Sequence, residues 1–307
     1  MSSKNNKKRF ALIGAGGYIA PRHVEAIKET NNELVALLDP YVGVGYIDKY
    51  FPYASYFRES ERFDRHLYRN KDSVDFVSIC SPNYLHDAHI RLSLRNGCDV
   101  ICEKPLVLRD KHLQSLKGLE KETGKKIYNI LQLRHHPLIK QLKEKYQNSN
   151  DLLHPHEVTL DYITPRGVWY DYSWKGDSDK SGGVVTNIGV HFFDMLIWIF
   201  GKVLAYKVET TGKRCKGVLH LEKAKVTYNL SIMKEDLPWD DWKPFRSIKI
   251  DGEELEFSTG FTDLHKVSYE EILKGNGFTL EDVEPTIKLI DGLRQKEVKL
   301  DGQTFYI

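Results

Sequence analysis

The fold is decided by the stretch Gly14-Ala15-Gly16-Gly17-Tyr18-Ile19, which follows an apolar run at residues 10–13 and opens a helical pattern. A glycine turn between a strand and a helix is typical of sites where helix N-terminal amides hold the phosphates of a dinucleotide. Gly14 allows the tight turn, and Gly16 lets a pyrophosphate approach the backbone. Ile19 replaces the third glycine of the usual pattern, which leaves close helix–strand packing open. A plain strand–helix turn is the alternative interpretation.

The second apolar run, residues 34–38, ends at Asp39, about 20 residues beyond the glycine turn. A carboxylate at this position can accept hydrogen bonds from ribose hydroxyls and repels a 2′-phosphate. Asp39 therefore favours NAD over NADP, and a simple turn residue before Pro40 is the alternative. The contacts with NAD predicted from this part of the chain are Gly14, Gly16, Gly17, Tyr18, Ile19 and Asp39.

The hydrophobic pattern divides the chain into two parts. Strands are predicted at 10–13, 34–38, 55–57, 76–80, 99–102 and 127–130, and helices at 18–29, 60–69, 83–96 and 109–123. This alternation predicts a doubly wound parallel sheet, a Rossmann domain, at residues 1–131. Short strands in a row are predicted at 158–163, 203–210, 217–221, 225–233, 245–250 and 255–258, with helices at 137–146, 185–200, 263–274 and 280–294. They indicate an α+β domain with a mostly antiparallel open sheet at residues 132–307.

Composition excludes several classes of function. The chain has 307 residues, and its net charge of +2 favours neither nucleic acid nor an acidic membrane as a partner. The longest apolar run, residues 190–200, is shorter than the ~20 residues of a membrane span, and residues 1–9 are too polar for a signal sequence. The four cysteines show neither pairing nor metal-ligand spacing. We expect buried thiols, no metal and a cytoplasmic protein.

Two further strand ends carry polar residues, and ligands collect at the carboxyl ends of parallel strands. Ser81 and Asn83 follow one strand and could contact NAD or cap the next helix, while His86 could face NAD or solvent. Glu103 and Lys104 follow the next strand, and Pro105 would fix the backbone, with a cis bond as one option. A lysine beside a cationic nicotinamide has a lowered pKa and can exchange a proton with a reacting hydroxyl. A surface lysine is the alternative.

Asn187 and His191 lie four residues apart in a predicted helix and therefore share a face. Asp194 could orient the imidazole of His191 or stabilise the helix. A histidine, an asparagine and a lysine converging on one alcohol would suit oxidation, because one group takes the proton while hydride leaves for the cofactor. The alternative for His191 is a histidine whose bonds are satisfied inside a buried helix.

These motifs together resemble the glucose-fructose oxidoreductase, inositol dehydrogenase and rhizopine catabolism (Gfo/Idh/MocA) family. Residues 17–23 (GYIAPRH), Asn187 in place of the more usual aspartate, and residues 260–278 are similar to one branch of it. That branch comprises UDP-N-acetyl-2-amino-2-deoxyglucuronate dehydrogenases of O-antigen and lipopolysaccharide synthesis. The resemblance implies NAD-dependent oxidation of the C3 hydroxyl of UDP-N-acetylglucosaminuronic acid. It assigns Lys104 and His191 as the catalytic pair, with His191 as general base and Asn187 positioning substrate.

The resemblance also implies partners and substrate contacts. A 2-keto acid such as 2-oxoglutarate is a candidate for reoxidising bound NADH, and a homodimer or homotetramer is expected. A UDP-sugar acid needs cations for its diphosphate and carboxylate. The candidates lie in the irregular stretch 164–183, which looks mobile, and in the helix after it. The predicted substrate contacts are Arg166, Trp169, Tyr170, Ser173, Trp174, Lys175, Asn187 and His191, with His265 and Tyr269 as weaker candidates.

Two other functions remain open at this point. One is a family dehydrogenase that acts on a free sugar or cyclitol. The other is a regulator that binds the dinucleotide without catalysing a reaction.

Overall fold

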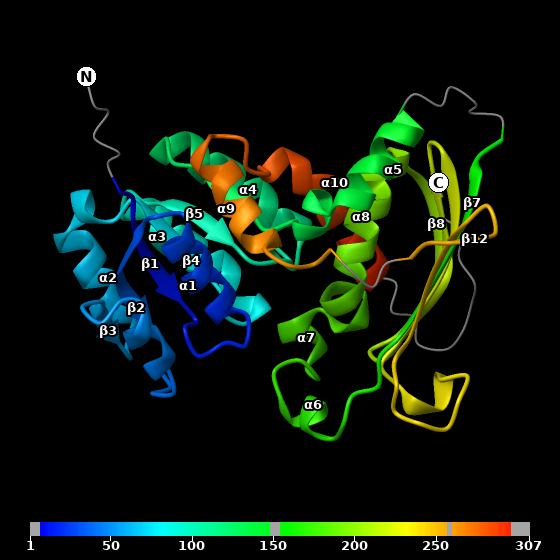
Figure 1. The fold of residues 1–307 in the computed structure, drawn as a ribbon, viewed down its shortest axis with the longest axis horizontal. Coiled ribbons are helices and arrows are strands. Elements are labelled where there is room, and N and C mark those ends of the chain that lie inside the picture. The colour runs from blue at the N-terminus through cyan, green and yellow to red at the C-terminus, as the bar shows by residue number, and fades with distance from the viewer. Residues whose placement is uncertain (1–6, 148–153, 257–259, 296–307) are drawn as a thin grey trace. The chain divides into compact units, whose positions relative to one another are not determined.

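Six parallel strands form the first sheet of this protein, which a computed structural model describes at residues 7–147, 154–256 and 260–295 (Figure 1). The strands are β1 (Arg9–Ile13), β2 (Glu33–Leu38), β3 (Ser55–Phe57), β4 (Phe76–Ile79), β5 (Asp99–Cys102) and β6 (Ile127–Asn129). Their order in the sheet is β3-β2-β1-β4-β5-β6. This is the strand order of Rossmann dinucleotide-binding folds, so the predicted fold class of this part is confirmed.

The helices of this sheet begin and end close to the predicted positions. They are α1 (Ala20–Glu29), α2 (Ser60–Arg69), α3 (His86–Arg95) and α4 (Asp110–Thr123), with a 3₁₀ turn at Asn83–Leu85 before α3. Gly97 and Gly124 follow α3 and α4 with φ values of 81° and 67°, the left-handed conformation that glycine adopts without strain. Each helix therefore ends just before a glycine that can turn the chain.

A late segment of the chain, α9 (Leu264–Leu273), belongs to the first compact unit. That unit comprises residues 1–107, 111–132 and 263–283. Helix α9 packs against α1 (Figure 1). Its Tyr269 is fully buried, with its ring centroid 5.7 Å from that of Phe10 in β1. The prediction of a single boundary after residue 131 differs from this division, because the sequence pattern carries no sign of such a long-range return.

The second unit is built on a mixed sheet in the order β12-β11-β7-β10-β9-β8. Its strands are β7 (His156–Ile163), β8 (Val203–Thr211), β9 (Arg214–Leu221), β10 (Ala224–Ser231), β11 (Phe245–Ile250) and β12 (Glu253–Glu254). All neighbouring pairs are antiparallel except β7 and β10, which are parallel, so the mostly antiparallel prediction is confirmed. The strand predicted at 255–258 is wrong in position, because β12 ends at Glu254. Residues 257–259 lie outside the described residues.

The helices of the second unit are α5 (Pro137–Gln147), α6 (Trp169–Tyr172), α7 (Ser178–Ser181) and α8 (Val190–Phe200), together with most of α10 (Leu280–Gln295). Helix α8 is apolar nearly all round and packs against α5. The ring of Phe193 meets Tyr228 of β10 at 5.2 Å, and the ring of Phe192 meets Tyr162 of β7 at 4.7 Å. These contacts place α8 against the sheet as the core helix of this unit.

The helical stretch Ser178–Phe200 is, by length and composition, apolar enough to cross a membrane. It is longer than the run expected from the sequence because the structure joins α7, a π-helical turn at Val185–Gly189 and α8 into one helical path. Within its most apolar window 83% of the residues are buried inside the protein. This burial is what a core helix of a globular domain shows.

Candidate active site

The glycine turn after β1 has the geometry expected of a phosphate-binding turn. Gly14 has φ +85°, and a Cβ placed there would lie 2.6 Å from the Cys80 carbonyl carbon and the Ser81 nitrogen. Its amide donates to the Leu38 carbonyl at 2.8 Å, and the amide of Gly17 donates to its carbonyl at 3.0 Å. Only glycine fits position 14, because any side chain would collide with the main chain after β4.

Asp39 reaches back from the end of β2 to this turn. Its Oδ2 accepts a hydrogen bond from the Gly16 amide at 2.7 Å, and its Oδ1 accepts one from the Tyr41 amide at 2.8 Å. A Cβ at Gly16 would lie 3.2 Å from both carboxylate oxygens. The carboxylate therefore forms the local turn across Pro40 and borders the glycine loop, while its contact with a ribose stays a prediction. These residues fit a dinucleotide whose ribose is held by an acid.

The missing third glycine has a local explanation. Helix α1 begins only at Ala20, and Ile19 precedes it, half-buried and packed against the core of the first unit. Ala20 and Val24 are fully buried and belong to the same apolar cluster as Phe10 and Leu12 of β1. Tyr18, which the sequence predicts as a cofactor contact, is 77% exposed.

The polar residues that follow β4 form hydrogen bonds with nearby side chains and main-chain carbonyls. Ser81 Oγ lies 2.9 Å from His89 Nδ1, and the N-cap residues of the 3₁₀ turn and of α3 are Pro82 and Leu85, neither of which makes a side-chain cap bond. Asn83 is buried. His86 is buried too, which makes the solvated interpretation wrong. Its Nδ1 lies 2.7 Å from the Pro105 carbonyl and its Nε2 lies 2.8 Å from the Ser81 carbonyl.

Lys104 follows Glu103 at the end of β5, and the Lys104–Pro105 bond is cis, as one of the two options predicted. Lys104 is half-buried, whereas the Glu103 side chain is buried. The Glu103 carboxylate, which the sequence predicts as a cofactor contact, accepts hydrogen bonds within the first unit. Its Oε1 accepts from His23 Nε2 at 2.9 Å and from His265 Nε2 at 3.0 Å, and its Oε2 accepts from the Lys104 amide at 3.2 Å.

Two residues considered as weaker substrate contacts belong to this buried cluster. His265 and Tyr269 are 4% and 0% exposed, and both side chains bond other residues of the first unit, so their role as substrate contacts stays a prediction. The Tyr269 hydroxyl lies 2.8 Å from His23 Nδ1 and 2.6 Å from Ser78 Oγ. We call His23, Ser78, Glu103, His265 and Tyr269 the Glu103 cluster. No sequence motif links His23 to His265 and Tyr269, so the sequence alone could not predict that they are in contact.

The electrostatics of the Glu103 cluster follow from burial and hydrogen bonding. Burial alone would raise the pKa of the Glu103 carboxyl, but the hydrogen bonds from His23 and His265 hold it well below its usual range. Burial lowers the pKa of His23, and the bond to Glu103 opposes this. The ligand atoms of His23, Glu103 and His265 also lie within 4.8 Å of one another, close enough for a metal ion. The two direct hydrogen bonds already account for their arrangement.

In the second unit, the stretch predicted to be irregular contains α6 and α7. Ser173 Oγ donates to the Tyr170 carbonyl at 2.8 Å and accepts from the Lys175 amide at 3.2 Å, so this predicted substrate contact shapes the turn after α6. The Lys175 ammonium lies 5.6 Å from the ring centroid of Trp169 and 5.8 Å from that of Trp174. Burial lowers the pKa of Lys175, and the nearby charge of Arg166 lowers it further. Two cations and two indoles therefore gather around one turn.

Asn187 lies in the π-helical turn before α8, and His191 lies in the first turn of α8. Asn187 Nδ2 donates to the Tyr170 hydroxyl at 3.1 Å. Tyr170 is 5% exposed, and burial raises the pKa of its phenol, while the bond with Asn187 opposes this. The structure therefore joins Asn187 to the turn that carries Lys175. Both Asn187 and His191 are half-buried.

Asp194 anchors α8. Arg134 donates to its carboxylate through Nε at 2.9 Å and Nη2 at 2.7 Å, and Thr286 Oγ1 of α10 donates to Oδ1 at 2.9 Å. All three residues are buried. Of the two roles considered for Asp194, stabilising the helix is the one these bonds support. Neither Arg134 nor Thr286 lies in a recognisable sequence motif, so sequence reasoning did not identify them as partners of Asp194.

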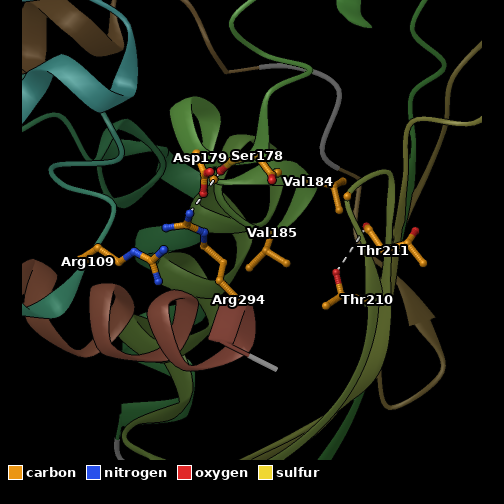
Figure 2. A pocket seen from close by; sticks show the side chains of 11 residues that line it. Arg109, Ser178, Asp179, Val184, Val185, Thr210, Thr211 and Arg294 are labelled. Carbon is orange, nitrogen blue, oxygen red and sulfur yellow. Dashed lines mark hydrogen bonds between the residues drawn. The ribbon is translucent and has the colours of Figure 1, made fainter. Parts of the chain in front are cut away.

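A small pocket of about 70 Å³ opens in the second unit beside α7 and the β8–β9 turn (Figure 2). Figure 2 shows the side chains of Arg109 and Arg294 beside it. Arg294 donates to the carbonyls of Leu108 and Ser178, and Arg109 Nη1 lies 3.5 Å from Asp291 Oδ1. None of the predicted substrate residues lines this pocket. Its arginines tie the segment 108–110 to α7 and α10.

A Rossmann sheet with a glycine turn and an acid after β2, joined to a second unit with a mixed sheet, defines a dinucleotide-dependent oxidoreductase. Two models of one protein family match this chain, one in each part. Residues 8–130 match the oxidoreductase family, NAD-binding Rossmann fold, and residues 148–237 match its C-terminal alpha/beta domain. The chain belongs to the Gfo/Idh/MocA oxidoreductase family.

Several solved structures are similar to this chain over nearly its whole length. The WlbA (WbpB) dehydrogenase from Thermus thermophilus in complex with NAD and UDP-GlcNAcA is 46% identical, with a TM-score of 0.88 over 94% of each chain. The structure of that dehydrogenase with NAD and alpha-ketoglutarate is 44% identical, with a TM-score of 0.89 over 96% of this chain and 97% of the other. The WlbA dehydrogenase from Bordetella pertussis, at 20% identity and a TM-score of 0.79 over 95% of each chain, shares the fold.

Among curated proteins, the D-glucoside 3-dehydrogenase of Escherichia coli K12 is 28% identical over 201 residues. The glucose-6-phosphate 3-dehydrogenase of Bacillus subtilis 168 is 25% identical over 198 residues. Each alignment covers 63% of this chain and 54% of the relative, so the chain spans about half the length of these curated relatives.

Proposed function

We propose that this protein is an NAD-dependent dehydrogenase that oxidises the C3 hydroxyl of UDP-N-acetylglucosaminuronic acid to the 3-keto sugar. The observation that carries the proposal is the 46% identity, over 94% of each chain, to a dehydrogenase crystallised with NAD and that nucleotide sugar. The glycine turn with Gly14 and Asp39 supports the cofactor, because position 14 excludes any side chain and Asp39 borders the loop.

Lys104 and His191 are proposed as the residues that handle the proton. NAD, when bound, accepts the hydride from C3. His191 acts as general base on the C3 hydroxyl, and Lys104 donates a hydrogen bond to the same oxygen while it becomes a carbonyl. Asn187 orients the sugar, and its own position is supported by the bond to Tyr170. Ser81, Asn83, His86 and Glu103 are proposed to border the cofactor at the carboxyl ends of β4 and β5.

The cations on either side of α6, Arg166 before it and Lys175 after it, are proposed to receive the acidic substrate. Arg166 and Lys175 are close enough for one charge to lower the pKa of the other, which is unfavourable until an anion arrives. A diphosphate or carboxylate would relieve this repulsion. Trp169 and Trp174, which flank the Lys175 ammonium, offer faces against which a sugar or base could pack.

The first experiment mixes the protein with NAD and UDP-N-acetylglucosaminuronic acid, with and without 2-oxoglutarate, and follows NADH absorbance and the 3-keto product. We propose that 2-oxoglutarate reoxidises the NADH, supported by the relative crystallised with NAD and alpha-ketoglutarate. Formation of 2-hydroxyglutarate in step with the keto sugar would be the expected result. Absence of turnover under both conditions would overturn the substrate assignment.

Variants separate catalysis from binding. Lys104→Met and His191→Asn should each lower kcat by roughly 100- to 10,000-fold, the usual contribution of general acid–base catalysis, while NAD still binds. NAD affinity is measured by calorimetry on the same samples. Unchanged NAD binding with unchanged turnover would exclude these residues, and NAD binding by the wild type without any turnover would favour a regulator.

A second candidate is oxidation at C3 of a free or phosphorylated sugar, favoured by the names of the two curated relatives. A panel of glucosides, hexose phosphates and inositols tests it. Arg166→Ala and Lys175→Ala should raise KM for the nucleotide sugar and leave any free-sugar rate unchanged. Equal loss on both substrates would contradict a role in binding the anionic groups.

The proposed setting is cytoplasmic synthesis of a 2,3-diamino sugar acid for O-antigen, with the protein acting as a homodimer or homotetramer. The four cysteines are buried and free, which suits a reducing compartment. Light scattering after size exclusion measures the mass of the assembly. A monomer at micromolar concentration would contradict the oligomer.

A further inference from the structure

The Glu103 carboxylate is held by three N–H donors. His23 comes from α1, His265 from α9, and the third donor is the amide of Lys104. His265 Nε2 and His23 Nε2 converge on the same oxygen, Oε1, leaving Oε2 for the amide. A buried carboxylate normally needs a cation or several donors. Here two imidazoles from opposite ends of the sequence, 242 positions apart (265 minus 23), meet this need.

The main chain around Lys104 is held by a series of hydrogen bonds. The Glu103 amide donates to the Ile79 carbonyl at 3.0 Å, and Asn129 Nδ2 donates to the Glu103 carbonyl at 3.3 Å. The Pro105 carbonyl lies 2.7 Å from His86 Nδ1. The Lys104 amide completes this set through Glu103 Oε2. The backbone that carries the lysine is therefore bonded before it, at it and after it.

The direction of the bonds in the cluster follows from the charge on Glu103. An ionised carboxylate only accepts, so both Nε2 atoms carry a hydrogen. With burial opposing a charge on His23, its Nδ1 accepts from the Tyr269 hydroxyl, which in turn accepts from Ser78. Each hydroxyl then donates once in a single direction. This assignment satisfies His23 at both ring nitrogens and leaves it no alternative tautomer.

We propose that His23 and His265 are positioning residues for Lys104: they fix the Glu103 carboxylate, which holds the lysine amide and so sets where the side chain starts. The inference rests on the proposed role of Lys104 in oxidising the sugar. Its consequence is that α9, nearly 160 residues after Lys104, takes part in turnover without touching the reactants.

His265 is the residue to test, because its imidazole bonds Glu103, whereas His23 bonds both Glu103 and Tyr269. His265→Ala removes the donor, and His265→Gln restores an N–H at nearly the same place. We expect kcat to fall roughly 10- to 100-fold in His265→Ala, as for a small misplacement of a catalytic group, with recovery in His265→Gln. KM for the sugar and the dissociation constant of NAD should change little.

Two controls separate positioning from loss of stability. Ile272→Ala also removes a buried side chain from α9 but lies outside the Glu103 cluster, so it should lower the melting temperature without lowering kcat. In a Lys104→Met background, His265→Ala should leave the residual rate unchanged, because its effect acts through the lysine. An equal fold-loss in both backgrounds, or an equal kcat loss in Ile272→Ala, would overturn the proposal.

The outcomes also distinguish this proposal from the proposed function. If wild type does not oxidise UDP-N-acetylglucosaminuronic acid, the function fails and the same comparison is run on the substrate that it does oxidise. If wild type turns over and His265→Ala keeps full kcat, the positioning role fails alone. Metal analysis of the purified protein is run in parallel. Stoichiometric zinc lost together with activity in His265→Gln would replace positioning by a metal centre.

Discussion

Two buried carboxylates support the two halves of the proposed catalytic pair, and they are held in different ways. Glu103 precedes Lys104 and accepts hydrogen bonds from two histidines. Asp194 follows His191 by three positions and accepts two bonds from Arg134 and one from Thr286. Histidine can lose its charge when its partner is removed, whereas an arginine cannot. The first arrangement should therefore tolerate change better than the second.

The largest effect should come from removing each carboxylate. Asp194→Ala leaves the Arg134 guanidinium buried without its partner and should cost about 3–5 kcal/mol of stability. Glu103→Ala leaves imidazole N–H groups unpaired and should cost about 1–3 kcal/mol, because the imidazoles can stay neutral. All five tryptophans lie in the second unit, so urea unfolding followed by fluorescence reports on Asp194. Hydrogen exchange of α9 and β5 reports on Glu103.

A double variant sharpens this first comparison. Arg134→Met with Asp194→Leu removes both charges and should recover much of the stability lost in Asp194→Ala. An equal loss of stability in Asp194→Ala and Glu103→Ala, or no recovery of stability in the double variant, would contradict this explanation. It would show that stability does not depend on whether the hydrogen-bonding partner can lose its charge.

Lowering the pH should destabilise the surroundings of Glu103 more than those of Asp194. Burial lowers the pKa of His23, which faces Glu103, His265 and Tyr269. A histidine with a lowered folded pKa binds its proton more readily when unfolded, so stability is complete above about pH 6.5 and falls as the pH drops below this value. The low pKa of the Glu103 carboxyl acts in the same direction at more acidic pH, since its contribution is lost as the pH falls through its folded pKa.

Hydrogen exchange in α9, corrected for intrinsic rates, measures this loss between pH 7 and pH 5. His23→Gln cannot gain a proton and should flatten the slope over that range. A slope as steep as that of the wild type would locate the acid sensitivity elsewhere. Tryptophan fluorescence of the second unit provides the internal comparison.

The same contrast explains what the sequence could predict. Strands β1 to β6 are short apolar runs ended by glycines or polar residues, so local pattern was enough to place Lys104 and Asp39 at the ligand edge. Asp194 stood out because it follows His191 in a motif. The partners of both carboxylates were missed: His265 lies 162 positions from Glu103 and Arg134 lies 60 from Asp194. Only the tertiary fold brings them together.

The second sheet shows the same limit. Its strands alternate clearly enough to be found, but the parallel pairing of β7 with β10 joins segments 68 positions apart in register, as for His156 and Ala224. No turn between neighbours dictates that pairing. Likewise, α9 reads as an ordinary helix in the C-terminal half, and its return to the first unit depends on Tyr269 fitting beside Phe10.

The last comparison concerns the outermost hydroxyl of each site. Thr286→Val removes a donor to the ionised Asp194 and should cost about 1.5–3 kcal/mol, as is usual for a bond to a charged group. Ser78→Ala removes a donor to the neutral Tyr269 hydroxyl, which still bonds His23, and should cost about 0.5–1.5 kcal/mol. Both positions are fully buried. Thr286→Val replaces the hydroxyl with a methyl group of similar size, and Ser78→Ala removes only the hydroxyl, so each change acts mainly on a hydrogen bond. Urea midpoints at pH 7 and at pH 5 give the test. The cost of Ser78→Ala should shrink at the lower pH, because protonation of His23 removes the acceptor at the end of that chain of bonds, whereas the cost of Thr286→Val should persist.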